Sequence, residues 1–274
     1  MHSSIATLQE FIETFLYYFE QGSNAEYVSL DKDLFFFIYD KLYDSDHPVP
    51  VNEEIGGHSP VWSKRAQVEN CRVYTTPWPS DFNKEKIPLK DHYNGSNLIM
   101  PFELMDEPEH VNRKSKQDLH LVFEYRKGDK ILGIVAPRSN RFYFVHDPNG
   151  ASFVQLETYH DLLDKVDPEK KPYRHMFGGF QLMQRLTAEE TESRLAKMAS
   201  LWFEAKQDGP GPDGQKNVFH VELAHFSSFD HFKLFEKYAV RNADSLGMNE
   251  VEMQMLLDYW KDGDDYDFLT EKEA

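Results

Sequence analysis

The stretch that decides the fold runs from Val218 to Glu252, beginning VFHVELAHF (residues 218–226) and closing with SLGMNEVEM (residues 245–253). Its first part is an apolar run bounded by turn residues, which is typical of a buried strand. Side chains alternate between the two faces of a strand, so His220 and Glu222 share one face, opposite the apolar side chains. A carboxylate at the end of a buried strand is costly unless it is compensated. We therefore expect Glu222 to have a hydrated cation or a hydrogen-bond network as its partner.

The end of this stretch carries the motif Asn249-Glu250-Val251-Glu252. Asn is a good N-cap, and a Glu three residues later reaches back to the cap, so the motif indicates a capping box that opens a helix over residues 250–260. A divided pair of glutamates also suits Mg²⁺, which keeps several waters and takes few carboxylates. Both interpretations stand. On the first, the helix would bury one apolar face, made of Met253, Leu256, Leu257 and Trp260.

Composition limits the classes of function. The chain has 274 residues, a formal net charge of −17 and 40% hydrophobic residues, including 21 Phe and 14 Tyr. This is globular composition, and the acidic balance argues against nucleic acid as a partner because phosphate binding needs concentrated Lys and Arg. The single cysteine excludes an intrachain disulfide framework. The sequence shows no secretory signal and no apolar run near the ~18 residues that span a bilayer, so we expect a soluble protein without a membrane span.

The remaining segments predict the order of helices and strands. Residues 5–21 have the spacing of a helix that Gly22 is placed to end, and residues 31–43 predict a second helix with Asp31 as its N-cap. The alternating residues 119–125, a turn and the apolar run 131–136 predict a β-hairpin, which a third strand over 141–146 follows. Helices and short strands then alternate, so the order favours an α/β core with an appended small β layer.

Four features together make the chain resemble the ADP-dependent glucokinases. HVELA (220–224) with SLGMNEVEM (245–253) resembles the family's paired HxE and NxxE motifs, and residues 22–26 with 31–33 resemble its early segment between helices. Residues 55–59 resemble its GGNA-type sugar-binding turn, and residues 119–125 with 136–142 resemble its lid strands with an NRF segment. The similarity covers most of residues 5–258, with a poor match over 75–117.

The resemblance implies an α/β fold with an incomplete ribokinase-like large domain and a small β-rich lid. Residues 1–274 would form one ribokinase-like unit. The lid would come mainly from about 115–150 with part of the N-terminal region. The α/β core would occupy about 50–80 and 150–260, followed by an acidic tail over 261–274.

The resemblance also implies roles for particular residues on the phosphate side of the site. Glu222 and Glu252 would organise a hydrated Mg²⁺ ion around the phosphates, with His220 and Asn249 in support. Arg141 would meet a phosphate of the nucleotide. In catalysis of this kind, positioning and charge neutralisation count for more than covalent chemistry.

On the sugar side, the resemblance implies that Glu26 and Gly57 contact the substrate. His58 stands where the family has Asn or Gln, which changes one sugar hydrogen bond. Glu26 favours glucose over fructose 6-phosphate, because an acidic residue would repel a phosphorylated substrate.

The implied activity is phosphorylation of glucose by ADP with Mg²⁺, in a protein expected to be a monomer. The family's first strand and its GxGD motif, which carries the catalytic base, are not among these 274 residues, so we expect the span by itself to have negligible kinase activity. One alternative is a non-catalytic pseudokinase that binds sugar or protein, and another is an α/β domain with no ligand. Animal members of the family are associated with the endoplasmic reticulum through an N-terminal segment; without such a segment a cytoplasmic location is expected.

Overall fold

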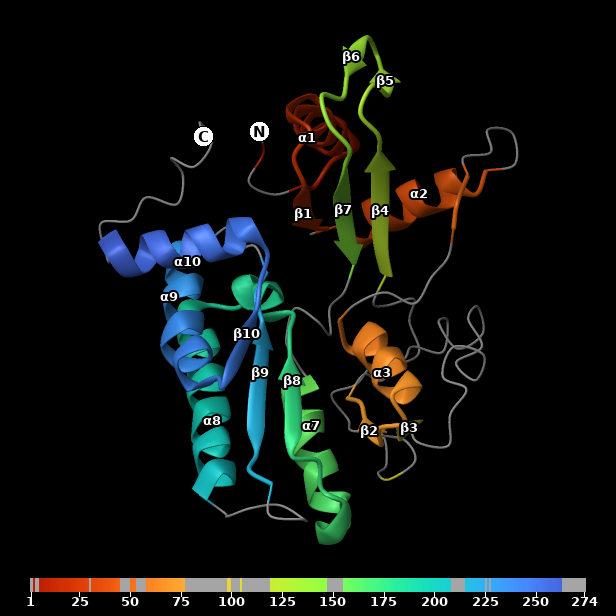
Figure 1. Cartoon of the computed structure of the whole chain (residues 1–274). Coiled ribbons are helices and arrows are strands. Elements are labelled where there is room, and N and C mark those ends of the chain that lie inside the picture. The colour runs from red at the N-terminus through yellow and green to blue at the C-terminus, as the bar shows by residue number, and fades with distance from the viewer. Residues whose placement is uncertain are drawn as a thin grey trace. The chain divides into compact units, whose positions relative to one another are not determined.

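The computed structural model describes residues 2, 5–29, 31–44, 50–52, 58–76, 98–99, 104, 119–146, 155–207, 215–224, 226 and 228–262. The chain divides into two compact units (Figure 1). Unit 1 comprises residues 1–54, 80–83 and 113–148, and unit 2 comprises residues 55–79, 84–112 and 149–274.

Unit 1 is a three-stranded sheet with helices on one face. The strand order is β1 (Ala25–Val28), β7 (Asn140–His146) and β4 (Leu119–Tyr125), with β1 parallel and β4 antiparallel to β7 (Figure 1). Helices α1 (Leu8–Gln21) and α2 (Lys32–Leu42) pack on one face through a core rich in aromatic residues. Its buried members are Ile5, Phe11, Leu34, Phe35, Ile38, Tyr39, Phe142 and Phe144.

Local sequence determines where these helices end. Asp31 accepts hydrogen bonds from two backbone amides of α2, which confirms the predicted N-cap. Gly22 ends α1 with φ at 62°, as predicted, because the left-handed conformation costs glycine little. The predicted start of α1 at residue 5 was wrong. Ile5 is fully buried in a β-bridge with Ser29, and the helix begins only after the capping box of Thr7.

The predicted hairpin between residues 119–125 and 131–136 was also wrong. Strand β4 pairs along its whole length with β7 instead. The segment between them forms its own small hairpin, from β5 (Lys130–Ile131) to β6 (Ile134–Val135). Leu132 and Gly133 both have positive φ, 49° and 85°, so the chain turns back after two residues and leaves β4 to the longer strand. The third predicted strand, over 141–146, is confirmed.

Unit 2 is built on a parallel sheet in the order β10-β9-β8 (Figure 1). These strands are Ser245–Gly247, Val218–Glu222 and Arg174–Phe177. The predicted faces of the central strand are confirmed: Phe219 and Val221 are fully buried, whereas His220 and Glu222 lie on the other, partly exposed face. Helices α7 (Gln155–Lys165), α8 (Ala188–Gln207) and α9 (Phe229–Tyr238) supply the apolar partners of the buried face.

The other elements of unit 2 are short except for two helices. They are α3 (His58–Val68), β2 (Val73–Tyr74), β3 (Leu98–Ile99), the 3-10 turns η2 (Pro168–Lys170), η3 (Phe180–Arg185) and η5 (Val240–Asn242), and α10 (Glu250–Asp262). Within the described ranges, none of the helices has the length and apolarity needed to cross a membrane. Most of residues 75–117, and the predicted acidic tail beyond 262, lie outside the described residues.

Helix α10 forms where predicted but buries a different face. Leu256 is buried as expected, together with Met255, whereas Met253, Leu257 and Trp260 are 48%, 49% and 52% exposed. Two contacts with α9 set this rotation. The Tyr259 ring packs 5.3 Å from Phe232, and the Trp260 indole donates a 2.8 Å hydrogen bond to the buried carboxylate of Glu236.

Candidate phosphate and metal site

The candidate site lies at the carboxyl end of the parallel sheet of unit 2. Glu222 is the last residue of β9, and the register of the sheet places Gly247 of β10 directly beside it. His220 lies beside Ser245 in the same way. Ligands of parallel α/β sheets bind outside the carboxyl ends of the strands, so this edge is the expected place for a site.

A row of hydrogen bonds holds Glu222. The His220 Nε2–H donates to Glu222 Oε2 at 3.3 Å, and the Ser245 hydroxyl lies 2.9 Å from His220 Nδ1. The ring of Trp62 from α3 meets the imidazole edge-on at 6.1 Å. The side chains of His220 and Glu222 are 25% and 29% exposed, so the row is partly shielded from water. The hydrogen-bond network that the sequence offered as one partner of Glu222 is therefore present.

Gly247 leaves the space that the Glu222 carboxylate occupies. A Cβ atom on Gly247 would lie 2.8 Å from Glu222 Cδ, 3.1 Å from His220 Nε2 and closer still to Glu222 Oε2. Real Cβ atoms essentially never approach to within 3.0 Å, so any larger residue here would push the carboxylate away. The Glu222 carboxylate can therefore lie where it does because Gly247 has no side chain.

Asn249 and Glu252 form the predicted capping box. Asn249 Oδ1 accepts from the Glu252 backbone N–H at 2.9 Å, and the Asn249 backbone N–H donates to Glu252 Oε2 at 2.9 Å. The side-chain amide of Asn249 donates to Glu252 Oε1, also at 2.9 Å. The capping interpretation is confirmed, and it holds both carboxylate oxygens in fixed positions. The cap occupies one acceptor position on each of these oxygens.

The implied Mg²⁺ ion would need oxygen donors, and Glu222 supplies an oriented carboxylate. Among the described residues, His, Cys, Asp and Glu side chains nowhere gather in the groups of three that typify a protein-made metal cluster. Mg²⁺ takes oxygen ligands, retains several waters and needs only one or two carboxylates. The oriented carboxylate of Glu222, in the space that Gly247 leaves open, fits a hydrated ion of this kind.

In unit 1, Glu26 and Arg141 lie on the sheet face opposite the helices. Glu26 is the register partner of Tyr143, and Arg141 stands two residues before Tyr143 on the same strand. The Arg141 guanidinium donates to the Tyr143 hydroxyl at 3.2 Å and lies 3.7 Å from Glu124. The structure therefore places these two predicted site residues on one polar face.

Sequence reasoning missed several neighbours of the predicted residues. Ser245, Gly247 and Trp62 belong to the Glu222 site, and Tyr143 belongs to the polar face of unit 1. The alternation of side chains along the predicted strand 141–146 was the signal that could have placed Tyr143 on the face of Arg141, whereas Ser245 and Gly247 needed the register of a parallel pair of strands. Of the predicted sugar residues, Gly57 lies outside the described residues. His58 begins α3, but its side chain lies outside them.

Comparison with known proteins gives a consistent result. The conserved region of ADP-specific phosphofructokinases and glucokinases matches residues 1–273. The ADP-dependent glucokinase of Bos taurus is 23% identical over 256 residues, which are 93% of this chain and 46% of that protein. A probable ADP-dependent glucokinase of Caenorhabditis elegans is 23% identical over 260 residues, which are 92% of this chain and 45% of that protein. The chain thus spans about half the length of these relatives.

Solved structures show the same fold. An ADP-dependent kinase in complex with fructose 6-phosphate and ADPβS superposes with a TM-score of 0.62 at 19% identity, covering 89% of this chain and 52% of that one. A reconstructed last common ancestor of the ADP-dependent phosphofructokinases from Methanosarcinales gives a TM-score of 0.56 at 19% identity, covering 94% and 52%. The predicted α/β fold class is confirmed.

Proposed function

The chain belongs to the ADP-specific phosphofructokinase/glucokinase family, and from this membership we propose that it serves the transfer of a phosphoryl group from ADP to glucose. The observation that carries the proposal is the row of Ser245, His220 and Glu222 beside Gly247, because it orients one carboxylate at the sheet edge where phosphates are expected.

Glucose is the proposed acceptor because of the charge on the polar face of unit 1. Glu26 is exposed there, and Glu124 on the same face pairs with Arg141. A phosphate group on the sugar would be repelled by the exposed carboxylate of Glu26. An uncharged sugar accepts hydrogen bonds from, and donates them to, such a surface at no electrostatic cost.

Each remaining residue has a proposed role in holding phosphate or sugar. Glu222 and Glu252 hold the waters of Mg²⁺, which when bound neutralises charge on the phosphates. His220 fixes the orientation of Glu222, and Asn249 fixes that of Glu252. By family resemblance, Gly57 and His58 contact the sugar and Arg141 meets a phosphate.

The 274-residue chain by itself is proposed to have negligible kinase activity, because a GxGD motif with its catalytic base is not found in its sequence. A coupled assay for glucose 6-phosphate made from ADP and glucose tests this directly. Turnover at the rate of ordinary kinases would overturn the proposal of inactivity. Saturable glucose binding without turnover is expected of this chain by itself, and the second candidate function, a non-catalytic sugar- or protein-binding pseudokinase, shares that behaviour.

Sugar specificity is tested by calorimetry. Glucose is expected to bind saturably and to lose about tenfold in affinity in Glu26→Gln, the value of one hydrogen bond to a charged group. Glu20→Gln is the matched control, since Glu20 is an exposed acid at the end of α1. Fructose 6-phosphate is expected to bind more weakly than glucose. Tighter binding of fructose 6-phosphate, or equal effects of the two variants, would contradict the role given to Glu26.

A further inference from the structure

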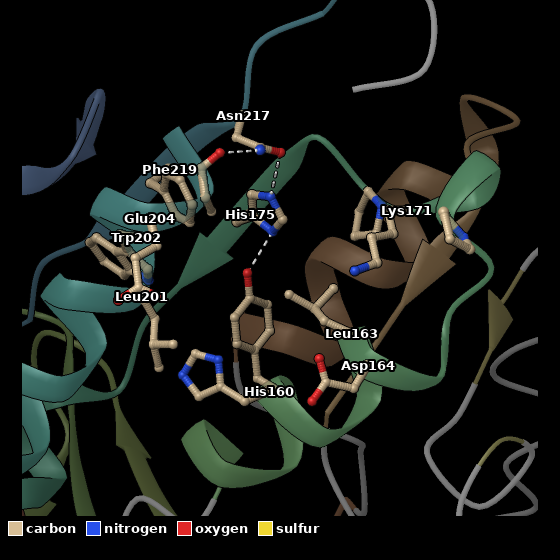
Figure 2. Close-up of a pocket in the computed structure, with 14 residues that line it drawn as sticks. His160, Leu163, Asp164, Lys171, His175, Leu201, Trp202, Glu204, Asn217 and Phe219 are labelled. Atoms are coloured by element: carbon tan, nitrogen blue, oxygen red, sulfur yellow. Dashed lines mark hydrogen bonds between the residues drawn. The ribbon is translucent and has the colours of Figure 1, made fainter. Parts of the chain in front are cut away.

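A cavity of about 400 Å³ opens in unit 2 where β8 and β9 begin, beside Trp202, His175 and Phe219 (Figure 2). The Tyr159 hydroxyl donates to His175 Nδ1 at 2.7 Å, and His175 Nε2–H donates to Asn217 Oδ1 at 3.2 Å. These hydrogen bonds join α7 to the start of the sheet, which is a structural role. A surface suited to recognition lies in unit 1 instead.

An apolar tip projects from unit 1 at the hairpin of β5 and β6. Leu132 at the turn is 82% exposed, and Val135 is 47% exposed. Figure 1 shows this hairpin extending past the ends of β4 and β7. Its other face is anchored, because Ile131 and Ile134 pack against the small core around Phe19. The tip is therefore presented on a fixed support.

Leu132 occupies a turn position that favours other residue types. Leu132 and Gly133 are the two central residues of the turn, and both have positive φ. Two-residue hairpin turns of this kind prefer Asn, Asp or Gly, because the left-handed conformation crowds the Cβ atom of other residues. A leucine here costs free energy through its backbone and again through its exposure to water. A residue kept in a strained position despite such a cost is a candidate for function.

Basic side chains surround the tip in an otherwise acidic chain. Residues 126–141 contain five basic residues and one acidic residue, whereas the whole chain carries −17 at pH 7. Arg126, Lys127 and Lys130 are exposed, and no ion pair joins them to another residue that the structure describes. Lys130 pairs across the hairpin with Val135, so a cation lies beside an exposed apolar side chain.

An apolar tip among cations fits the surface of an anionic lipid bilayer. Apolar side chains enter the boundary between headgroups and acyl chains, and each nearby Lys or Arg is attracted to anionic headgroups. Leu132 lies roughly 10 Å beyond the Asp129–Ala136 pair at the base of the hairpin, since a strand rises about 3.3 Å per residue. This reach matches the ~5–10 Å depth of interfacial insertion.

Two other partners fit less well. A second copy of the chain would bring two basic hairpins together, and their charges would repel. Nucleic acid would attract the cations but offers its backbone phosphates, not an apolar layer, to Leu132.

We propose that the hairpin of β5 and β6 docks this protein reversibly on anionic lipid membranes, with Leu132 inserted and Arg126, Lys127 and Lys130 at the headgroups. One inserted side chain with a few cations makes a weak anchor, so the docking is reversible. The hairpin contains none of the residues proposed to hold sugar, phosphate or metal. The proposal therefore stands or falls independently of the kinase function.

The test is sedimentation of the 274-residue chain with vesicles of phosphatidylcholine, either alone or with added phosphatidylserine. Binding is expected only with phosphatidylserine, and it should weaken as salt is added. Leu132→Asn should bind about tenfold more weakly, the lower end of the value of burying a leucine side chain. Its fold should persist, because Asn suits a positive φ.

Charge reversal provides a second variant with its own control. Lys130→Glu should bind about thirtyfold more weakly, because it changes the charge near the surface by two units. Lys64→Glu on α3 and Leu257→Asn on α10 make the same chemical changes at exposed positions elsewhere. Both controls should bind as the unmodified chain does.

A polarity-sensitive dye distinguishes insertion from adsorption by charge alone. Attached to Leu132→Cys in a Cys71→Ser background, the dye should shift its emission to the blue with anionic vesicles. The same dye on the exposed Cys71 of the unmodified chain, in unit 2, should not. No sedimentation with anionic vesicles, equal binding to neutral ones, an equal loss in Leu257→Asn, or no blue shift at position 132 would each overturn the proposal. Binding to single-stranded DNA as tight as binding to vesicles would also overturn it.

Discussion

Gly247→Ala is expected to disable the Glu222 site while it leaves the fold intact. The new Cβ would lie 2.8 Å from the Glu222 carboxyl carbon and closer still to Oε2, so the carboxyl carbon must retreat by roughly 0.6 Å to reach an ordinary 3.4 Å contact. The atoms that must move are the far end of a flexible side chain, and Gly247 is not among the glycines with positive φ. The side chain of Glu222, rather than the backbone, should therefore move.

The expected magnitudes separate folding from binding. Replacing glycine by alanine stabilises the chain by about 0.4–1 kcal/mol, because it lowers the conformational entropy of the unfolded state. Loss of the contact between Glu222 and His220 costs about 0–1 kcal/mol. The free energy of unfolding should therefore change by less than about 1 kcal/mol. Metal sites tolerate displacements of about 0.2 Å in their ligand distances, and loss of the groups that orient a ligand costs about 10–100-fold in metal affinity. A similar loss is expected in Gly247→Ala, because the displacement exceeds this tolerance.

The assay uses Mn²⁺ as a paramagnetic substitute for Mg²⁺, since both prefer carboxylate and water ligands. Broadening of the Leu223 amide signal, next to Glu222, should need at least tenfold more Mn²⁺ in Gly247→Ala, and excess Mg²⁺ should reverse the broadening in the unmodified chain. Adding Glu222→Asp to Gly247→Ala shortens the crowded side chain, so the double variant should recover part of the affinity. Unchanged broadening, or destabilisation by more than about 3 kcal/mol, would refute the reasoning.

Three further predictions concern stability. Gly22→Ala should lower the free energy of unfolding, measured in a urea melt, by about 2–4 kcal/mol, because φ is +62° and a Cβ would lie 2.6 Å from the Arg138 side chain. Gly128→Ala, at φ +91° in open space, should lower it by only about 1–2 kcal/mol. Equal losses in the two variants would contradict the crowding argument. Asn249→Ala should cost about 1 kcal/mol and Asn249→Asp much less, measured in the same way; equal melts for both variants would rule out the cap. Burial lowers the pKa of His160 to about 4, so the unfolded chain binds the proton first as the pH falls below about 6.5. The free energy of unfolding should therefore fall by on the order of 1 kcal/mol by pH 4, a value reduced because solvent screens this partly exposed group. His160→Gln should flatten this part of the profile of melting temperature against pH, and an unchanged slope would assign the acid sensitivity to other groups.

Local sequence determined the ends of elements and the faces of the strand through the site. Asp31 and Asn249 carry their own capping groups within three residues of the amides they bind, so tertiary structure is not needed to form these caps. The alternation around His220 and Glu222 was equally readable, because neighbouring side chains of a strand must point to opposite faces. The family resemblance rested on the same short motifs and was confirmed by the match over residues 1–273.

Tertiary structure decided which segments meet. Strand β4 pairs with β7 rather than with the nearer apolar run, because a tight turn at Leu132 folds that run on itself. The rotation of α10 depends on contacts with α9 that periodicity does not encode. The space that Gly247 leaves for Glu222 exists only once two parallel strands adopt one register, and the cavity beside Trp202 exists only once helices α7 and α8 pack at the start of the sheet. Such long-range contacts join residues far apart in the chain, so the sequence supplied the chemical groups and packing determined their neighbours.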